Sequence, residues 1–234
     1  MTSFSLPTDY PRIKRVNSFQ ELVGTRFADG VNALCWERAL PGGFSEVVSK
    51  LSDNEGIVTL DEASLLALPV NAAGRVAIDF LLTDYHLLRN RDLDPVLNCI
   101  REYPRDDGVV PTDVYSFHAD SAPVEADTYL CTYHGVPSEG LRNEEALRRI
   151  DVPETRAELL KYFGGDDNDT FREYLKENCY HLHYAPIASA RPFSFGIGNL
   201  WRIALDYPGS PVPPCIHRAP ENKHGDSPRL LLIS

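Results

Sequence analysis

The chain has 234 residues, 43% of them hydrophobic and 24% charged, which is ordinary for one globular domain with a well-filled core. Acidic residues (34) outnumber Lys and Arg (23), and the formal net charge of −11 argues against nucleic acid as a partner. No apolar run is long enough to cross a membrane, and the N-terminus lacks a signal-peptide pattern. We therefore expect a soluble, cytoplasmic protein with no membrane partner.

The five cysteines are widely spaced and include no Cys-x-x-Cys pair. An odd number without such a pair fits reduced thiols better than a disulfide framework or a structural zinc site.

The first half of the chain predicts mainly helices. Residues 1–30 predict an irregular arm, and residues 31–36 a first buried strand. Apolar residues at helical spacing predict helices over 44–51 and 72–89, and Asp61 could cap a short helix that ends near Leu68. We also expect a helix over 95–103, because proline favours the first turn of a helix.

The second half predicts strands around a helical insertion. Strands are expected over 114–117, 128–133, 192–197, 200–205 and 229–233. Between them, near 142–178, helices are expected over 144–150 after an Asn143 cap, over 153–163, and from Asp169 or Thr170 to Asn178. This order indicates an α+β fold, in which residues 31–234 form one domain with a jelly-roll (double-stranded β-helix, cupin-like) core.

A His-x-Asp pair ends the first strand of this second half. Side chains two residues apart on a strand project from one face, so His118 and Asp120 would point into the same space. His217 follows in the late-strand region, and Arg229 begins the last strand. Two His and one carboxylate with open positions are the facial triad suited to non-haem Fe(II). His118, Asp120 and His217 are therefore the predicted metal ligands and catalytic centre.

This order of residues resembles the iron and 2-oxoglutarate dioxygenases of the jelly-roll type. The resemblance implies that Arg229 forms a bidentate pair with the distal carboxylate of the co-substrate 2-oxoglutarate. Tyr129, Thr132 and Tyr133 are candidates to donate to the same carboxylate. Many of these enzymes carry Ser or Thr two residues after the Arg, whereas this chain has Leu231.

Longer segments of the chain resemble an uncharacterised bacterial family, domain-of-unknown-function family 1826. The resemblance implies one shared domain beyond the N-terminal arm and implies no activity. It is carried by residues 30–38 (GVNALCWER), 117–120 (FHAD), 130–135 (LCTYHG), 216–220 (IHRAP) and 229–232 (RLLL).

The expected activity is hydroxylation of a small organic substrate with dioxygen. Candidate substrate-binding residues are Arg218, Arg202, His134 and His183. Alternatives stay open: a metal-binding jelly roll without turnover, an iron oxygenase that uses no 2-oxoglutarate, or a second metal set built on His181 and His183. The expected partners are the small molecule and dioxygen, with a homodimer as an open alternative.

Overall fold

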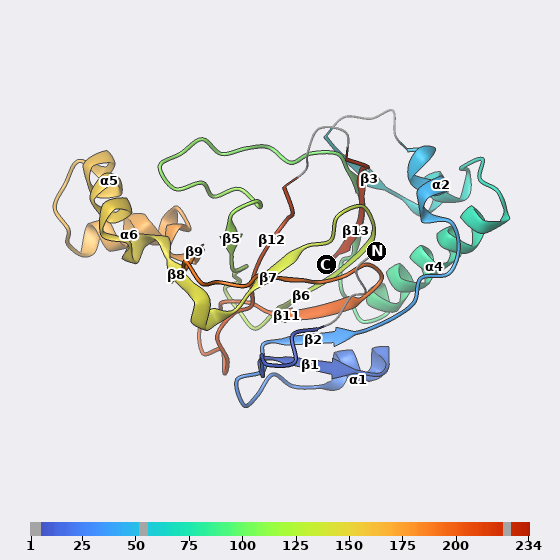
Figure 1. Ribbon diagram of the computed structural model, residues 1–234, viewed down its shortest axis with the longest axis horizontal. Coiled ribbons are helices and arrows are strands. Elements are labelled where there is room, and N and C mark those ends of the chain that lie inside the picture. Colours follow the sequence, from blue (N-terminus) through green and yellow to red (C-terminus); the bar gives the residue numbers. More distant parts are fainter. Residues whose placement is uncertain (1–5, 52–55, 222–225) are drawn as a thin grey trace.

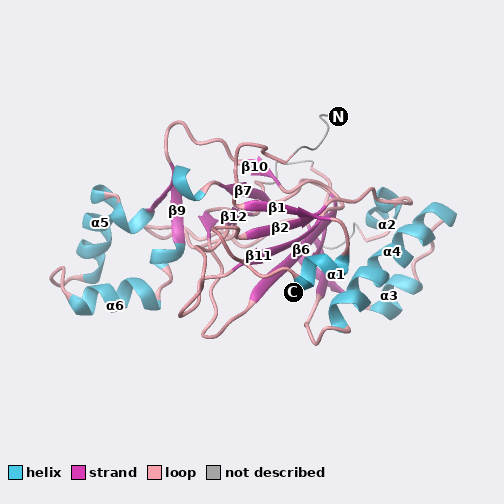
Figure 2. Ribbon diagram, turned by 90° about the horizontal axis from the view of Figure 1, so that it is seen from below, coloured by secondary structure: helices cyan, strands magenta, loops and turns pink. Residues whose placement is uncertain are grey.

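The computed structural model describes residues 6–51, 56–221 and 226–234. It shows an α+β fold with two β-sheets in the middle of an elongated molecule. One group of helices lies at each end, α1–α4 at one and α5 and α6 at the other (Figures 1 and 2). No helix among the described residues combines the length and the apolar character that a membrane crossing requires.

The larger sheet has seven strands and is mostly antiparallel; only β1 and β2 are paired in parallel. In spatial order its strands are β1 (Ile13–Val16), β2 (Ala33–Trp36), β11 (Leu200–Ala204), β6 (Asp127–His134), β13 (Arg229–Ile233), β4 (Val96–Ile100) and β3 (Ile57–Leu60).

The smaller sheet has six strands, and every described pairing in it is antiparallel. In spatial order they are β10 (Phe193–Ser194), β7 (Glu139–Leu141), β12 (Ile216–Arg218), β5 (Phe117–His118), β9 (His183–Pro186) and β8 (Ala146–Arg148).

From β4 onward the chain passes repeatedly between the two sheets. The strands β4, β6, β11 and β13 belong to the larger sheet, and β5, β7, β10 and β12 to the smaller one. Consecutive members of this set therefore change sheets at every step except from β7 to β10, where the helical insertion intervenes.

Four helices cover one face of the larger sheet: α1 (Phe19–Gly24), α2 (Phe44–Ser49), α3 (Glu62–Leu66) and α4 (Ala72–Arg89). Their apolar side chains form one buried cluster with Tyr129, Cys131 and Tyr133 of β6. Because strand side chains alternate between faces, Thr128, Leu130 and Thr132 point to the opposite face. Leu130 accordingly packs in a separate buried cluster, with Trp201 of β11.

The insertion between β7 and β10 forms its own small core. It contains α5 (Pro153–Phe163), α6 (Asp169–Glu177) and the 3₁₀ turns η1 (Asn143–Glu145), η2 (Arg149–Asp151) and η3 (Tyr180–Leu182). The buried side chains of this core are Val110, Ile150, Leu159, Phe171 and Leu175. All five cysteines are free, and four of them are buried.

Four expectations about secondary structure were wrong. Residues 114–116 form a turn instead of a strand, and β5 contains only Phe117 and His118. The expected arm contains β1 and α1, whose first turn is capped when the Ser18 hydroxyl accepts from the Glu21 N–H at 3.1 Å. Residues 96–100 form strand β4, because this short run pairs with both β3 and β13. Residues 144–150 form two 3₁₀ turns around β8, and Asn143 directs its side chain to Tyr10, Asn32 and Pro214 instead of capping a helix.

Candidate metal centre

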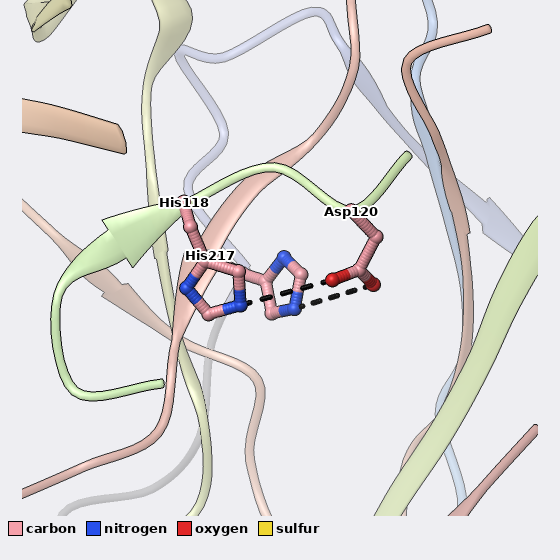
Figure 3. Close-up of side chains that lie close together, drawn as sticks. All are labelled: His118, Asp120 and His217. Carbon is pink, nitrogen blue, oxygen red and sulfur yellow. Dashed lines mark ion pairs between the residues drawn. The ribbon is translucent and has the colours of Figure 1, made fainter. Parts of the chain in front are cut away.

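Three side chains that are distant in sequence converge on one point. His118 ends β5, Asp120 follows it in the loop, and His217 lies on the neighbouring strand β12 (Figure 3). One ligand atom from each lies within 4.8 Å of the others. The Nε2 atoms of His118 and His217 are each 3.7 Å from a different carboxylate oxygen of Asp120. The sequence prediction that these three residues meet is therefore confirmed.

Strand register places the two imidazoles side by side. His217 is directly opposite His118 in the antiparallel pair β12–β5, so both project from the same face of the smaller sheet. Their ring centroids are 4.6 Å apart. On the other side of His217 its partner is Gly140 of β7, where a Cβ would come within 2.2 Å of the Phe193 ring. A glycine is required here because Phe193 occupies the space beside the histidine pair.

Backbone carbonyls orient both rings for metal binding. Nδ1 of His118 lies 2.8 Å from the Ser116 carbonyl, and Nδ1 of His217 lies 3.3 Å from the Cys215 carbonyl. A carbonyl can only accept, so Nδ1 carries the proton in each ring and donates it. The lone pair is then on Nε2, the atom that faces Asp120. Metal-binding histidines are commonly held in this way through the other ring nitrogen.

The protonation states of His118 and Asp120 at neutral pH favour binding of a metal cation. Burial is the main cause that lowers the pKa of His118 to about 4, and the adjacent His217 ring adds to the effect. Burial also raises the pKa of Asp120, but the two imidazoles and the Thr128 hydroxyl outweigh it, so the pKa of this carboxyl lies below its ordinary value. At neutral pH the site therefore offers a neutral His118 ring and a charged carboxylate, the forms that coordinate metal.

Asp120 is held by both its side chain and its backbone. The Thr128 hydroxyl donates to Oδ2 over 2.8 Å, and the Asp206 N–H donates to the Asp120 carbonyl over 2.8 Å. The preceding residue, Ala119, donates its N–H to the Leu182 carbonyl over 3.0 Å. These contacts fix the carboxylate although it lies beyond the end of β5.

Arg229 is buried beside a set of neutral oxygen atoms. Its side chain donates to the Val136 carbonyl (2.8 Å) and to the hydroxyls of Ser138 (2.9 Å), Tyr103 (3.2 Å) and Thr132 (3.4 Å). The residue is 1% exposed, and none of its hydrogen-bond partners among the described residues is a carboxylate. Burial lowers the pKa of Arg229, yet a guanidinium stays charged in proteins. A buried cation surrounded by neutral partners is ready to accept an anion.

The strand β6 links Arg229 to the metal ligands. Thr128 contacts Asp120 and Thr132 contacts Arg229, and these threonines share one face of the strand. Four residues of strand separate them by roughly 13 Å. Gly135, which follows β6 with φ +84°, allows the close approach of Arg229, because a Cβ there would be 3.0 Å from the Arg229 Cα.

Three of the predicted site residues lie on the other face of the larger sheet. Tyr133 donates its hydroxyl to Asp84 of α4 at 2.7 Å, and Tyr129 belongs to the core under the helices. Arg202 pairs with Asp127 at 2.6 Å and donates to backbone carbonyls at the end of α1. Strand alternation turns all three away from Thr128 and Thr132, so their proposed contacts with co-substrate or substrate are incorrect.

Three further residues, Arg218, His134 and His183, were candidates for substrate binding. Arg218 pairs with Glu139 at 2.7 Å and lies over the Phe117 ring, so its side chain is on the face opposite to His217. His134 directs Nδ1 to the Pro228 carbonyl at 3.1 Å. His183 is opposite His118 in β9, with ring centroids 5.8 Å apart, and its Nδ1 lies 2.6 Å from the Ser116 hydroxyl. Only His183 of these borders the metal ligands.

Sequence reasoning missed four residues that support the site. Tyr103 and Ser138 contact Arg229, Thr128 contacts Asp120, and Ser116 contacts both His118 and His183. Hydroxyl residues in loops carry no spacing signal. Thr128 alone could have been found, because it shares the strand face of Thr132.

The chain matches no protein-family model, no curated protein and no solved structure. The resemblances drawn from its sequence motifs therefore stay predictions, and any proposed function rests on the geometry of the site.

Proposed function

We propose that this protein is an Fe(II)- and 2-oxoglutarate-dependent dioxygenase that hydroxylates a small organic substrate. The observation that carries the proposal is the combination of two features: a His/Asp/His cluster and, along the same face of β6, a buried guanidinium whose partners are neutral.

The strand order supports a jelly-roll core. In this architecture the chain alternates between two facing antiparallel sheets of four strands. The spatial orders β4, β13, β6, β11 and β5, β12, β7, β10 follow that scheme, with β1, β2 and β3 added to one sheet and β8 and β9 to the other. On this proposal the metal ligands come from two neighbouring strands, β5 and β12, and from the loop after β5, at the mouth of the core, a site that small-molecule ligands commonly use.

The donor set fits Fe(II) in particular. Two neutral imidazoles and one carboxylate suit a divalent transition metal and leave coordination positions for other ligands. Asp120 keeps 31% of its side chain exposed, so the cluster is reachable from outside. Bound Fe(II) would activate dioxygen, which is the oxidant, with two of its four electrons drawn from oxidative decarboxylation of the 2-oxo acid and two from the substrate.

Arg229 explains why a dicarboxylate is the proposed co-substrate. A 2-oxo acid that reaches from the metal towards Thr132 would place its far carboxylate beside the guanidinium. That pairing would compensate the charge of Arg229 inside the protein, where an unpaired ion is costly. The hydroxyls of Ser138, Thr132 and Tyr103 surround the same guanidinium and would take the role that Ser or Thr two residues after the Arg has in the resembled enzymes.

The decisive experiment compares 2-oxoglutarate with pyruvate, which is also a 2-oxo acid but lacks the distal carboxylate. Binding to the Fe(II)-loaded protein is measured by calorimetry without oxygen. We expect Arg229→Gln to weaken 2-oxoglutarate binding about 100-fold and to leave pyruvate binding nearly unchanged, because the guanidinium contacts only the distal group. Ser138→Ala should show the same selectivity with a smaller loss, and Arg218→Gln, on the other face, serves as the control.

Turnover is then tested by oxygen uptake coupled to succinate release. If Arg229→Gln and Ser138→Ala bind 2-oxoglutarate as tightly as the wild type, the co-substrate assignment is wrong. If the wild type binds 2-oxoglutarate but releases no succinate, the protein is a metal-binding sensor and not an oxygenase.

A further inference from the structure

We propose that the helical insertion contains a second binding site, for a small phosphate-bearing anion. The site is a cavity of about 260 Å³ between α5, α6 and the turns η2 and η3. Five basic side chains face one carboxylate around it: Arg148, Arg156, Arg172, Lys176 and His181 against Asp151. It lies in the part of the molecule farthest from α1–α4 (Figures 1 and 2) and shares no residue with the metal ligands.

The concentration of positive charge is unusual for this chain. The formal net charge is −11, yet four Lys and Arg side chains line this single small cavity. Charges of one sign around a cavity raise the local concentration of oppositely charged ligands. The lining therefore selects an anion.

The arrangement of the basic residues favours a phosphate group over a carboxylate. Arg148 ends β8, Arg156 lies on α5, and Arg172 and Lys176 lie four residues apart on one face of α6. Donors thus come from three different elements. A phosphate group presents several acceptor oxygens in different directions and can meet donors from several sides, whereas a carboxylate offers two oxygens in one plane.

His181 supplies an independent indication of a missing partner. Its Nδ1 is buried and has no hydrogen-bond partner among the described residues. Buried polar atoms in folded proteins nearly always have a partner, either protein, water or ligand. In its present orientation this nitrogen is closed to solvent, so an anion in the cavity that His181 lines would gain the hydrogen bond when the imidazole ring turns toward it.

The existing ion pairs leave the basic groups available. Each cation has a carboxylate partner in an ion pair on the surface of the insertion, and only one of these carboxylates also lines the cavity. The pairs are Arg148–Asp151 (2.8 Å), Arg156–Asp167 (2.6 Å), Arg172–Asp169 and Lys176–Glu173 (3.2 Å). Three of these pairs are exposed contacts that contribute little stability, so exchanging them for a multivalent anion costs little. Arg156 and Asp167 form a bidentate pair, which an anion would share rather than replace.

The cavity also adjoins the metal-binding strands. His181 belongs to η3, which leads directly into β9, and His183 of β9 is opposite His118. The carbonyl of Leu182, between the two histidines, accepts from Ala119. An anion held at His181 would therefore stabilise the segment that flanks the metal centre.

The test uses the metal-free full-length protein and two probes, inorganic phosphate and pyrophosphate, at low ionic strength. We expect saturable binding by calorimetry and a shift of the His181 ring nitrogen resonances in NMR, with the exposed His86 of α4 as the unshifted reference. Arg172→Gln with Lys176→Gln should weaken binding at least about tenfold, because two charge-assisted contacts are lost. Both side chains are exposed, so the fold should survive, and circular dichroism checks this.

Lys161→Gln is the matched control, since Lys161 is exposed on α5 but does not line the cavity. No saturable binding, equal affinity in the Arg172/Lys176 double variant, or an unmoved His181 resonance would each overturn the proposal. Binding that the Lys161 control weakens as much as the double variant would reveal a nonspecific effect of charge and would also overturn it. Because no metal is present, these outcomes are separate from the fate of the oxygenase proposal.

Discussion

Thr128 donates its hydroxyl to Oδ2 of Asp120 over 2.8 Å, and this contact reaches from the larger sheet to the candidate metal ligands beside the smaller one. Contacts of this kind orient a ligating carboxylate without touching the metal. We predict that Thr128→Val lowers Fe(II) affinity about 10- to 100-fold with little change in fold, because valine has the shape of threonine but no donor. Thr128→Ser, which keeps the hydroxyl, should retain most of the affinity. Equal affinities for the valine variant and the wild type would show that the contact has no role in binding.

A buried ion pair joins β6, α4 and the segment after β2. Arg38 and Asp84 are 2.6 Å apart, with side chains 8% and 2% exposed, and Tyr133 donates to the second Asp84 oxygen. We predict that Asp84→Ala destabilises the protein by about 3–5 kcal/mol, because it leaves a buried guanidinium without compensation. The measurement is the free energy of unfolding in urea.

The exposed pair of Arg15 with Glu37 is the control for this experiment, since its side chains are 59% and 35% exposed. Glu37→Gln should change the free energy of unfolding by less than about 0.5 kcal/mol. If Asp84→Ala destabilised the protein less than Glu37→Gln does, the buried pair of Arg38 and Asp84 would have no structural role.

The loop before β5 should give stability a dependence on pH. The Thr112 hydroxyl, the Thr112 N–H and the Gly108 N–H, in that order, lower the pKa of Asp106 below 3.8. A carboxyl with a lowered folded-state pKa stabilises the fold above its unfolded pKa and loses that contribution as pH falls through the folded value. Asp106→Asn should therefore cost about 0.5–1 kcal/mol at pH 7, a small value because solvent screens this group, and progressively less as the pH falls below 3.8.

The measurement for Asp106 is urea unfolding at several pH values, with the exposed neighbour substituted as Asp107→Asn for comparison. A difference between wild type and Asp106→Asn that stays constant from pH 7 to pH 2 would refute the assigned contacts.

Local sequence signals predicted the longer helices well. The helix over 72–89 was predicted at its observed bounds, because apolar spacing repeats over several turns. The structure adds its N-cap, where the Asn71 side chain accepts from the Gly74 N–H. The run at 96–100 was misassigned because five residues with a proline before them suit a helix start as well as a strand. The run forms a strand because it pairs with β3 and β13, and this long-range pairing cannot be predicted from the local sequence.

The candidate site shows the same division between local and long-range information. The spacing of two residues alone predicted that the side chains of His118 and Asp120 point into the same space. His217 was chosen as the third ligand because it lies in the late-strand region. Tyr129 and Tyr133 were placed with Thr132, although strand alternation assigns them to the opposite face. Tyr103 and Ser138 reach Arg229 from loops, and only the three-dimensional structure brings such residues together.

The proposed function requires that His118, Asp120 and His217 hold Fe(II) together with a chelating 2-oxo acid. Its most direct test is the visible absorption spectrum after Fe(II) and 2-oxoglutarate are added without oxygen. We predict a charge-transfer band in the wild type and in His86→Ala, whose substitution lies on α4, and no band in His118→Ala or His217→Ala. Absence of the band from the wild type, or its persistence in either ligand variant, would rule out this metal centre.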